Sequence, residues 1–229
     1  MSDGRHPERR PPADGRGERP EILHADEAIV VVDKPAGRIV HPAPGHMTDA
    51  LTQELVKRHP EMASVGSEER PGVVHRLDVE TSGVIVFART QAAYLALRRQ
   101  FESHRDVRKT YLAVCHWKRG VAPRGTIDTP IQRQPAISHY EVLGRQGALA
   151  LVRFDIETGR THQIRIHAAK TLGCPIAGDS LYGDSVRDRS LRRRPSRALL
   201  HAVELSFLHP KTRRRVTFSA PPPPDLVFA

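Results

Sequence analysis

The stretch RPGVVHRLDVETSGVIVFART, residues 70–90, sets a polar segment between two β-branched runs. The runs predict buried strands, so the polar segment must lie in solvent or in a cleft. Its polar side chains include His75, Arg76, Asp78, Thr81 and Ser82. A carboxylate in a cleft stays ionised when an arginine lies within a few ångström, which makes Asp78 a candidate nucleophile or base. A turn that Asp78 caps through Thr81 and Ser82 is the alternative, and composition does not choose between the two.

The apolar pattern on either side of this stretch predicts more strands than helices. Strand-like runs occupy residues 28–37 (closed by a turn at 34–37), 109–116, 138–143, 148–157, 199–210 and 214–221, the last two joined by a turn at 209–213. Helical spacing covers 48–59, 91–104 and 161–172. Thr161 is the expected N-cap and Gly173 the expected C-cap of the third helix. Residues 61–72 and 184–197 are expected to be loops. This pattern predicts an α+β fold with a mixed, mainly antiparallel central β-sheet flanked by helices and loops.

The length allows one large domain or two small ones. With 229 residues, of which 38% are hydrophobic, the chain can bury a core without a disulfide or a metal. Residues 1–20 are rich in Pro, Gly, Arg and Glu and predict a disordered leader, which leaves 21–229 as the domain. No apolar run is long enough to span a membrane or to form a signal peptide. Cys115 and Cys174 have no disulfide or metal spacing, so we expect two buried thiols in a reducing cytoplasm.

The chain is strongly basic, with 36 Lys plus Arg against 26 Asp plus Glu. The first twenty residues contribute a net charge of only +1. Three later clusters are more basic: residues 98–109 (+3), 184–197 (+4) and 211–215 (+4). Arginine outnumbers lysine in the chain, and its planar guanidinium suits phosphate contacts and base stacking. Clusters inside the folded region favour a polyanion partner.

A second polar segment, ETGRTHQIRIHAAKTLGCPIAGDSLYG, covers residues 157–183. Gly159 can supply a turn before its predicted helix, which carries His162, Arg165 and His167 in its first two turns. A buried arginine near the positive end of a helix is a natural counter-ion for a carboxylate.

Other kinds of site are disfavoured. His162 and His167 are five residues apart rather than four, and no glutamate follows His162, so the spacing argues against zinc. The sequence lacks a phosphate-binding P-loop and a dinucleotide-binding glycine motif. A triad of Ser82, His75 and Asp78 would lack the GxSxG nucleophile elbow.

Five motifs, in this order, resemble those of the RluA-type pseudouridine synthases. They are DKPAGRIVHP (33–42), RPGVVHRLDVETSGVIVFART (70–90), RKTYLAV (108–114), ETGRTHQIRIHAAKTLGCPIAGDSLYG (157–183) and LLHAVELSFLHP (199–210). The resemblance covers roughly residues 22–220 and implies that 21–229 form a pseudouridine synthase catalytic domain. Many relatives carry an S4-type RNA-binding domain before this part, whereas about 20 residues precede the first strand here. The chain therefore resembles the compact branch of the family.

The resemblance also implies roles for individual residues. Asp78 matches the essential catalytic aspartate, and Arg165 matches the basic residue that pairs with it. Tyr111 matches the tyrosine that stacks on the uracil and is a candidate to handle its C5 proton. Arg76 matches the residue that inserts where the target base has flipped out, and Leu200 the apolar residue under the site. The other residues expected at the RNA are His75, Thr81, Arg160 and His162.

The implied activity is an isomerase that converts specific uridines in structured ribosomal or transfer RNA to pseudouridine. The uracil leaves C1′ through N1 and rejoins it through C5, so nothing is oxidised and no cofactor or metal is needed. Asp78 can attack C1′ or remove the 2′ hydrogen to give a glycal, and the sequence leaves both routes open. We expect the basic clusters to rim the cleft around Asp78. We further expect a cytoplasmic monomer with no membrane contact and no obligate protein partner.

Two other functions remain as alternatives. A catalytically silent relative could use the same cleft to remodel RNA, although intact Asp78, Tyr111 and Arg165 argue against it. A metal-dependent nuclease built on the histidines would require strand cleavage that EDTA inhibits.

Overall fold

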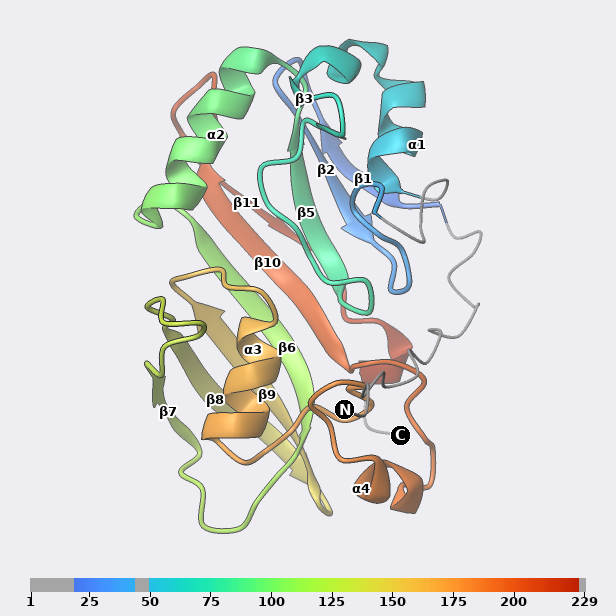
Figure 1. The fold of residues 1–229 in the computed structure, drawn as a ribbon, viewed down its shortest axis with the longest axis vertical. Helices are drawn as coiled ribbons and strands as arrows, with labels where there is room; N and C mark the ends of the chain where they lie inside the picture. Colours follow the sequence, from blue (N-terminus) through green and yellow to red (C-terminus); the bar gives the residue numbers. More distant parts are fainter. Residues whose placement is uncertain (1–18, 44–49, 227–229) are drawn as a thin grey trace, which may run out of the picture.

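A mixed, mainly antiparallel sheet forms the centre of the protein (Figure 1). This computed structural model describes residues 19–43 and 50–226. The strands of the sheet are β1 (Glu21–Ala25), β2 (Ile29–Lys34), β5 (Ser82–Ala88), β6 (Arg108–His116), β7 (Arg124–Ile127), β8 (Ser138–Gln146), β9 (Leu149–Ile156), β10 (Leu200–Leu208) and β11 (Arg215–Ser219). Their order is β1-β2-β5-β10-β6-β9-β8-β7, and β11 pairs with β10. Only β5 and β10 pair in parallel within the described sheet, so the predicted fold class is confirmed.

The helices lie towards the two ends of this sheet (Figure 1). They are α1 (Leu51–Arg58), α2 (Gln91–Ser103), α3 (Gln163–Ile166), which continues as a π-helical segment over His167–Thr171, and α4 (Ser185–Ser190). Short 3-10 helices cover Pro60–Ser64 and Pro224–Leu226. In Figure 1, α1 and α2 lie at one end of the molecule, and α3 and α4 at the other. Within the described ranges, no helix has the length and apolar character that a membrane span requires.

Strand β5 is buried on both faces, which explains its unbroken apolar sequence. Ile85 and Phe87 belong to one hydrophobic core, whereas Val84 and Val86 belong to a second core. A strand covered on both sides reads as a continuous apolar run rather than as an alternating one. Because β5 is buried on both faces, its start is fixed in the sheet, and this fixes the end of the polar loop that carries Asp78.

Gly83 allows β5 to approach β10 closely. Its φ is +113°, and a Cβ at this position would lie 2.2 Å from the carbonyl oxygen of Ala202. The parallel register pairs Ser82 with His201 and Gly83 with Ala202. Only glycine fits such a contact, so the glycine of the TSG sequence brings the end of the Asp78 loop against β10.

Several sequence-based predictions need correction. The first apolar run of 70–90 forms no strand and contributes only a single bridge, from Val73 to Phe87. The expected loop 61–72 contains the end of a 3-10 helix and a small hairpin of β3 (Gly66–Ser67) and β4 (Arg70–Pro71). The expected loop 184–197 contains α4, and strands β1 and β7 were not predicted.

The remaining predicted helix boundaries agree with the structure where the structure describes them. Helix α2 matches its prediction to within one residue, and α1 begins at Leu51, while residues 48 and 49 of the predicted helix fall outside the described part. The first eighteen residues of the expected leader also fall outside it. Cys115 and Cys174 are both buried and free, as expected.

Candidate active site

A cleft of about 460 Å³ brings together the nine residues to which the family resemblance gives a role at the site, whereas Ser82 lines a separate cavity. Its walls come from the loop before β5, from α2, from β6, from the segment that leads into α3, and from the start of β10. The predicted residues that line it are His75, Arg76, Asp78, Thr81, Tyr111, Arg160, His162, Arg165 and Leu200. These residues are up to 125 positions apart in the chain, so the sheet topology assembles the cleft.

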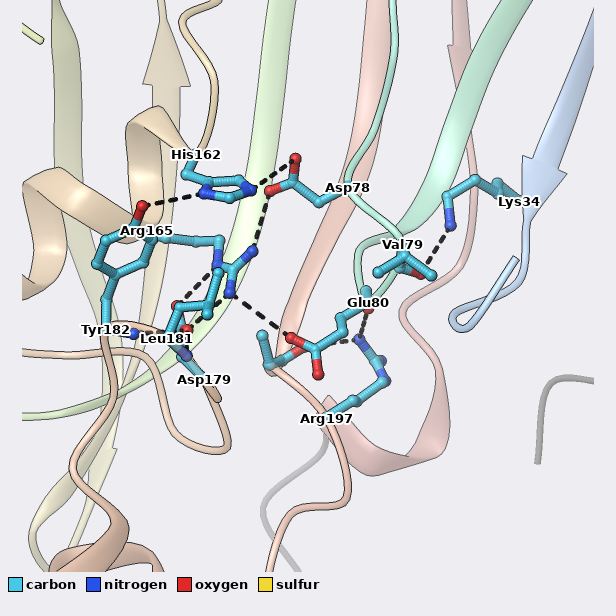
Figure 2. A network of polar contacts seen from close by, with 11 residues as sticks. Lys34, Asp78, Val79, Glu80, His162, Arg165, Asp179, Leu181, Tyr182 and Arg197 are labelled. Carbon is cyan, nitrogen blue, oxygen red and sulfur yellow. Dashed lines mark hydrogen bonds and ion pairs between the residues drawn. The ribbon is translucent and has the colours of Figure 1, made fainter. Parts of the chain in front are cut away.

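The Asp78 carboxylate is directed at the start of α3 (Figure 2). Its Oδ2 lies 3.4 Å from Nη1 of Arg165, and its Oδ1 lies 3.8 Å from Nε2 of His162. The side chain is 16% exposed, so ligands can reach it although it is largely enclosed. The turn after Asp78 is closed by the main chain, with the Thr81 amide donating to the Asp78 carbonyl over 3.1 Å. The carboxylate is therefore available for chemistry, and the alternative in which it caps this turn is wrong.

Arg165 is buried among three carboxylates. Its Nε and Nη2 donate to both oxygens of Asp179, at 2.8 and 2.7 Å, and its Nη2 lies 3.7 Å from Glu80. Its guanidinium carbon also lies 5.5 Å from the centre of the Tyr182 ring. Burial works against the charge, but the bonds to Asp179 and the charge of Asp78 raise the pKa of Arg165 above its ordinary value. Arg165 is therefore a fixed cation beside Asp78.

Asp179 holds Arg165 in place, and the sequence reasoning missed it. One of its oxygens also accepts the amides of Leu181 and Tyr182, at 2.9 and 3.0 Å. Burial opposes its ionisation, but the bonds from Arg165 keep the pKa of Asp179 below its ordinary value. The available signal was the Gly-Asp-Ser turn in residues 178–180, since aspartate often bonds to backbone amides two or three positions ahead.

His162 occupies a strained position at the start of α3. Its φ is +56°, in the left-handed region that non-glycine residues rarely adopt, and such strain is often found at functional sites. Its Nδ1 lies 3.0 Å from the Tyr182 hydroxyl, while Nε2 faces Asp78 (Figure 2). Burial lowers the pKa of His162, which favours a neutral ring at pH 7. The expected N-cap, Thr161, makes no such cap, because His162 takes that position.

Two buried cations hold the backbone of the Asp78 loop from the side away from Arg165. Lys34 donates from Nζ to the Val79 carbonyl over 3.1 Å, and Arg197 donates from Nη1 to the Glu80 carbonyl over 3.1 Å (Figure 2). Burial and the nearby Arg197 lower the pKa of Lys34 to about 7. These bonds fix two consecutive carbonyl groups directly after Asp78 and therefore limit the movement of Asp78.

Tyr111 lies on β6 and is 9% exposed. Burial and the negative charge of Asp78 raise the pKa of its phenol well above the ordinary value. The side chain is therefore a neutral phenol at pH 7. It can present a ring face to a base. Because the phenol keeps its proton, Tyr111 can take up another proton only by giving away its own.

The ring of His75 lies in the cleft wall and is held by contacts within the protein. It stacks on Phe101 with ring centres 4.4 Å apart, and its Nε2 accepts the Val86 amide over 3.2 Å. Burial lowers its pKa to about 3, so the ring is neutral. Ser82 bonds instead to Nδ1 of His201, at 2.9 Å, so the Ser82 and His75 pair that a triad requires is not formed.

The two histidines considered as zinc ligands have different neighbours. His167 bonds to the Ser138 hydroxyl and the Thr129 carbonyl, at 3.0 and 2.9 Å, whereas His162 faces Tyr182 and Asp78. Across the described ranges, no three His, Cys, Asp or Glu side chains are grouped so that they could hold a metal ion.

Only one of the three basic clusters reaches the cleft wall. Arg98 and Lys109, from the first cluster, line the cleft. From the second cluster, Arg193 and Arg197 line a separate cavity of about 530 Å³ behind Glu80. The cluster at residues 211–215 lines neither. The expectation that all three clusters rim the cleft therefore holds for the first cluster only.

Comparison with known proteins identifies the family of this chain. A family model described as RNA pseudouridylate synthase matches residues 28–170. This chain belongs to that family, as its RluA-type motifs indicate. It is 43% identical to an uncharacterized RNA pseudouridine synthase of Chloroflexus aurantiacus, over 85% of this chain and 63% of the relative. It is 41% identical to the ribosomal large subunit pseudouridine synthase D of Xanthomonas campestris pv. campestris, over 90% of this chain and 66% of the relative.

Solved structures of two human proteins have a similar fold. The human RNA pseudouridylate synthase domain containing 1 superposes with a TM-score of 0.71 and 27% identity, covering 92% of this chain and 87% of the human chain. The human RNA pseudouridylate synthase domain containing 4 gives a TM-score of 0.70 and 26% identity, covering 90% of both chains. The chain spans slightly less than two thirds of the length of the two bacterial relatives.

Proposed function

We propose that this protein converts specific uridines in structured RNA to pseudouridine, with Asp78 as the catalytic residue. The observation that carries this proposal is the Asp78 carboxylate, held 3.4 Å from the Arg165 guanidinium in a cleft that Tyr111 also lines. Membership in the RNA pseudouridylate synthase family, an isomerase family, supports it. The proposal covers the RNA class as well: the curated relatives named above include a ribosomal large subunit enzyme, which makes ribosomal RNA our first candidate and transfer RNA the second.

The reaction is an isomerisation within one nucleotide. The bond from N1 of the uracil to C1′ of the ribose breaks, the base turns, and a bond from C5 to C1′ forms. The hydrogen on C5 leaves as a proton, and N1 gains one, so no electrons are transferred. The catalyst must therefore act at C1′ or C2′ and must hold the freed uracil until it rejoins.

Asp78 performs the first of these tasks. Its carboxylate attacks C1′ or removes the 2′ hydrogen, and both routes need an ionised carboxylate whose orientation is fixed. Arg165 supplies the adjacent positive charge, and it is itself fixed by Asp179. Lys34 and Arg197 hold the backbone of the same loop. The site is therefore preorganised, as a transition state with developing charge requires.

The freed base stacks on Tyr111. Stacking on an aromatic ring stabilises a bound base by about 1–3 kcal/mol whichever base it is. The neutral phenol adds no repulsive charge. As a phenol, Tyr111 can relay the C5 proton but cannot accept it while it retains its own.

The uridine must leave its helix before the reaction. Extrusion costs a few kcal/mol, which a side chain that fills the gap partly offsets. Arg76 is exposed at the cleft, and its guanidinium can stack between bases and contact a phosphate. Leu200 and Thr81 are buried in the wall of the cleft and complete the pocket for the nucleotide. The protein is proposed to act as a cytoplasmic monomer without an obligate protein partner.

Pseudouridine mapping tests the proposal. Total RNA is compared between a strain that lacks this gene and the same strain carrying the wild type, Asp78→Ala or Asp78→Asn. We expect at least one uridine to be modified only with the wild type, while purified variants keep the wild-type unfolding midpoint. A mark restored by either variant would show that Asp78 is not catalytic. If the wild type restored no mark, the proposed function would be wrong.

The same experiment separates an RNA-remodelling protein from an enzyme. A strain defect in ribosome assembly that Asp78→Asn corrects, with no wild-type-dependent pseudouridine in any RNA, would favour the catalytically silent alternative.

A further inference from the structure

Lys109 is a buried cation that the proposed reaction does not use. It lies on β6 two residues before Tyr111, and residues two apart on a strand point to the same face. Lys109 is 8% exposed and lines the same cleft as Tyr111. Its Nζ donates to the Thr158 carbonyl over 2.9 Å, and in the part of the chain that the structure describes it forms no ion pair. A buried charge without a counter-ion is unfavourable, so its presence calls for a ligand.

The charge around Lys109 is also positive. Arg160 lines the same part of the cleft and, among the described residues, pairs with no carboxylate; its Nε donates to the Pro135 carbonyl over 3.0 Å. Burial and the Arg160 charge lower the pKa of Lys109 to about 8, and burial together with the charges of Lys109 and Arg160 lowers the pKa of His104. The buried Nδ1 of His104 has no hydrogen-bond partner among the described atoms. The acidic side chain on this wall of the cleft is Glu102, and it pairs with Arg98. Among the described residues, neither Lys109 nor Arg160 has a carboxylate partner.

Gly159 leaves room beside the lysine. A Cβ at Gly159 would lie 3.3 Å from Nζ of Lys109, closer than most Cβ contacts, and Gly159 lines the cleft. Any other residue would crowd the ammonium group on this side. The ammonium has three donors, of which one bonds to Thr158, so two remain for a ligand.

We propose that Lys109, assisted by Arg160, binds the phosphodiester of the nucleotide whose uracil stacks on Tyr111. This inference rests on the proposed function, because it takes RNA as the ligand. Consecutive positions on one face of a strand are about 7 Å apart, which is on the scale of the separation between the base and the phosphate of one nucleotide. Lys109 would hold the backbone of the extruded nucleotide while Asp78 acts on its sugar.

The test combines a protein change with an RNA change. The RNA is a stem-loop that carries the uridine identified by pseudouridine mapping, and the two phosphates that flank this uridine are replaced, one at a time, by neutral methylphosphonates. Binding is measured for the wild type, Lys109→Gln and Lys109→Arg. Arg119→Gln is the matched control, because Arg119 is exposed beyond the opposite end of β6 and does not line the cleft.

The wild type should lose roughly 10- to 100-fold in affinity at one of the two methylphosphonates, the range expected for a charge-assisted hydrogen bond. Lys109→Gln should bind the unmodified RNA more weakly by a similar factor, should be insensitive to that same methylphosphonate, and should show a salt slope smaller by about 0.7 to 0.9. Lys109→Arg should recover part of the sensitivity. Arg119→Gln should respond to the methylphosphonates like the wild type.

The outcomes separate this inference from the proposed function. If Lys109→Gln were as sensitive as the wild type at both positions, while the wild type formed pseudouridine, the phosphate assignment would be wrong and the proposed function would stand. If Lys109→Gln lost affinity but kept the methylphosphonate sensitivity, Lys109 would have only a structural role. A wild type that formed no pseudouridine in this RNA would contradict the proposed function itself.

Discussion

Arg165 and Lys109 are buried cations on the wall of one cleft, but their surroundings differ in charge. Arg165 faces Asp78, Glu80 and Asp179, whereas Lys109 has one carbonyl partner and a second cation beside it. The protein itself compensates the first charge, so Arg165 is already fixed in the free protein. In our proposal, bound RNA compensates the second charge. Substitutions around Arg165 should therefore damage the folded protein, and substitutions around Lys109 should affect only RNA binding.

The largest effect on stability is expected from Asp179→Asn. The change leaves the buried guanidinium of Arg165 without its bidentate partner, and breaking such a pair typically destabilises a protein by about 3–5 kcal/mol. Because the pKa of Asp179 is lowered, this contribution is complete above the ordinary aspartate pKa and is lost as the pH falls through the lowered value. Denaturant unfolding at pH 7 and at acidic pH measures both effects.

Glu141→Gln is the matched control. Glu141 pairs with Arg153 over 2.9 Å, but both side chains are 44% exposed, so the expected loss is about 0–1 kcal/mol. Equal losses for Asp179→Asn and Glu141→Gln would mean that the buried network does not depend on Asp179.

Tyr111→Ala should weaken RNA binding by about 1–3 kcal/mol, because the base loses its stacking surface. Tyr111→Phe should keep the affinity, since it retains the ring. Titration of the same stem-loop at fixed salt measures both. A loss of affinity in Tyr111→Phe as large as in Tyr111→Ala would show that the hydroxyl, rather than the ring, contacts the RNA.

A smaller effect concerns pH. Because the pKa of Lys109 is lowered to about 8, its charge is present below pH 8 and lost above it, so RNA affinity should fall between pH 7 and pH 9. The pKa values of His75 and His104, which face Lys109, are lowered, so neither histidine gains a charge in this range. Lys109→Arg should flatten the decline, because arginine keeps its proton. An identical decline in both proteins would assign it to another group.

The smallest effect is expected at the second basic cluster. Arg192, Arg193 and Arg194 are exposed, whereas Arg197 is buried and bonds to Asp225 through two nitrogens. Changing the three exposed arginines to glutamine should weaken RNA binding modestly and flatten its salt dependence, with no change in stability. Unchanged affinity and salt slope would show that this segment faces away from the RNA. Arg197→Gln should instead destabilise the fold.

The strands that could be predicted from sequence are those with a strong apolar pattern. Strands β2, β5, β6 and β10 lie in the interior of the sheet and carry long β-branched or alternating runs. The edge strand β7 has one buried residue, Ile127, and the edge strand β1 has only half-buried and exposed residues. An element that buries little gives little periodic signal, which is why these two were missed.

At the site, too, some residues could be predicted from sequence and others could not. The motifs single out Asp78, Arg165 and Tyr111 as candidate site residues, because the motif spacing is local and specific, and the fold brings all three to one cleft. The partners that hold these residues could not be found in this way: Asp179 and Lys34 gain their roles only through contacts that the fold creates. Helix α4 was missed for a related reason, since its only buried residue is Asp188, which bonds to His116 over 2.7 Å rather than to an apolar neighbour.

RNA affinity and single-turnover rate, measured together for Asp78→Asn and Lys109→Gln, test most directly whether Asp78 is the catalytic residue. We expect Asp78→Asn to bind the stem-loop within a few-fold of the wild type and to form no pseudouridine. We expect the opposite for Lys109→Gln: weaker binding by about tenfold or more, with a rate at saturating RNA within a few-fold of the wild type. Pseudouridine formed by Asp78→Asn at the wild-type rate would show that Asp78 is not catalytic.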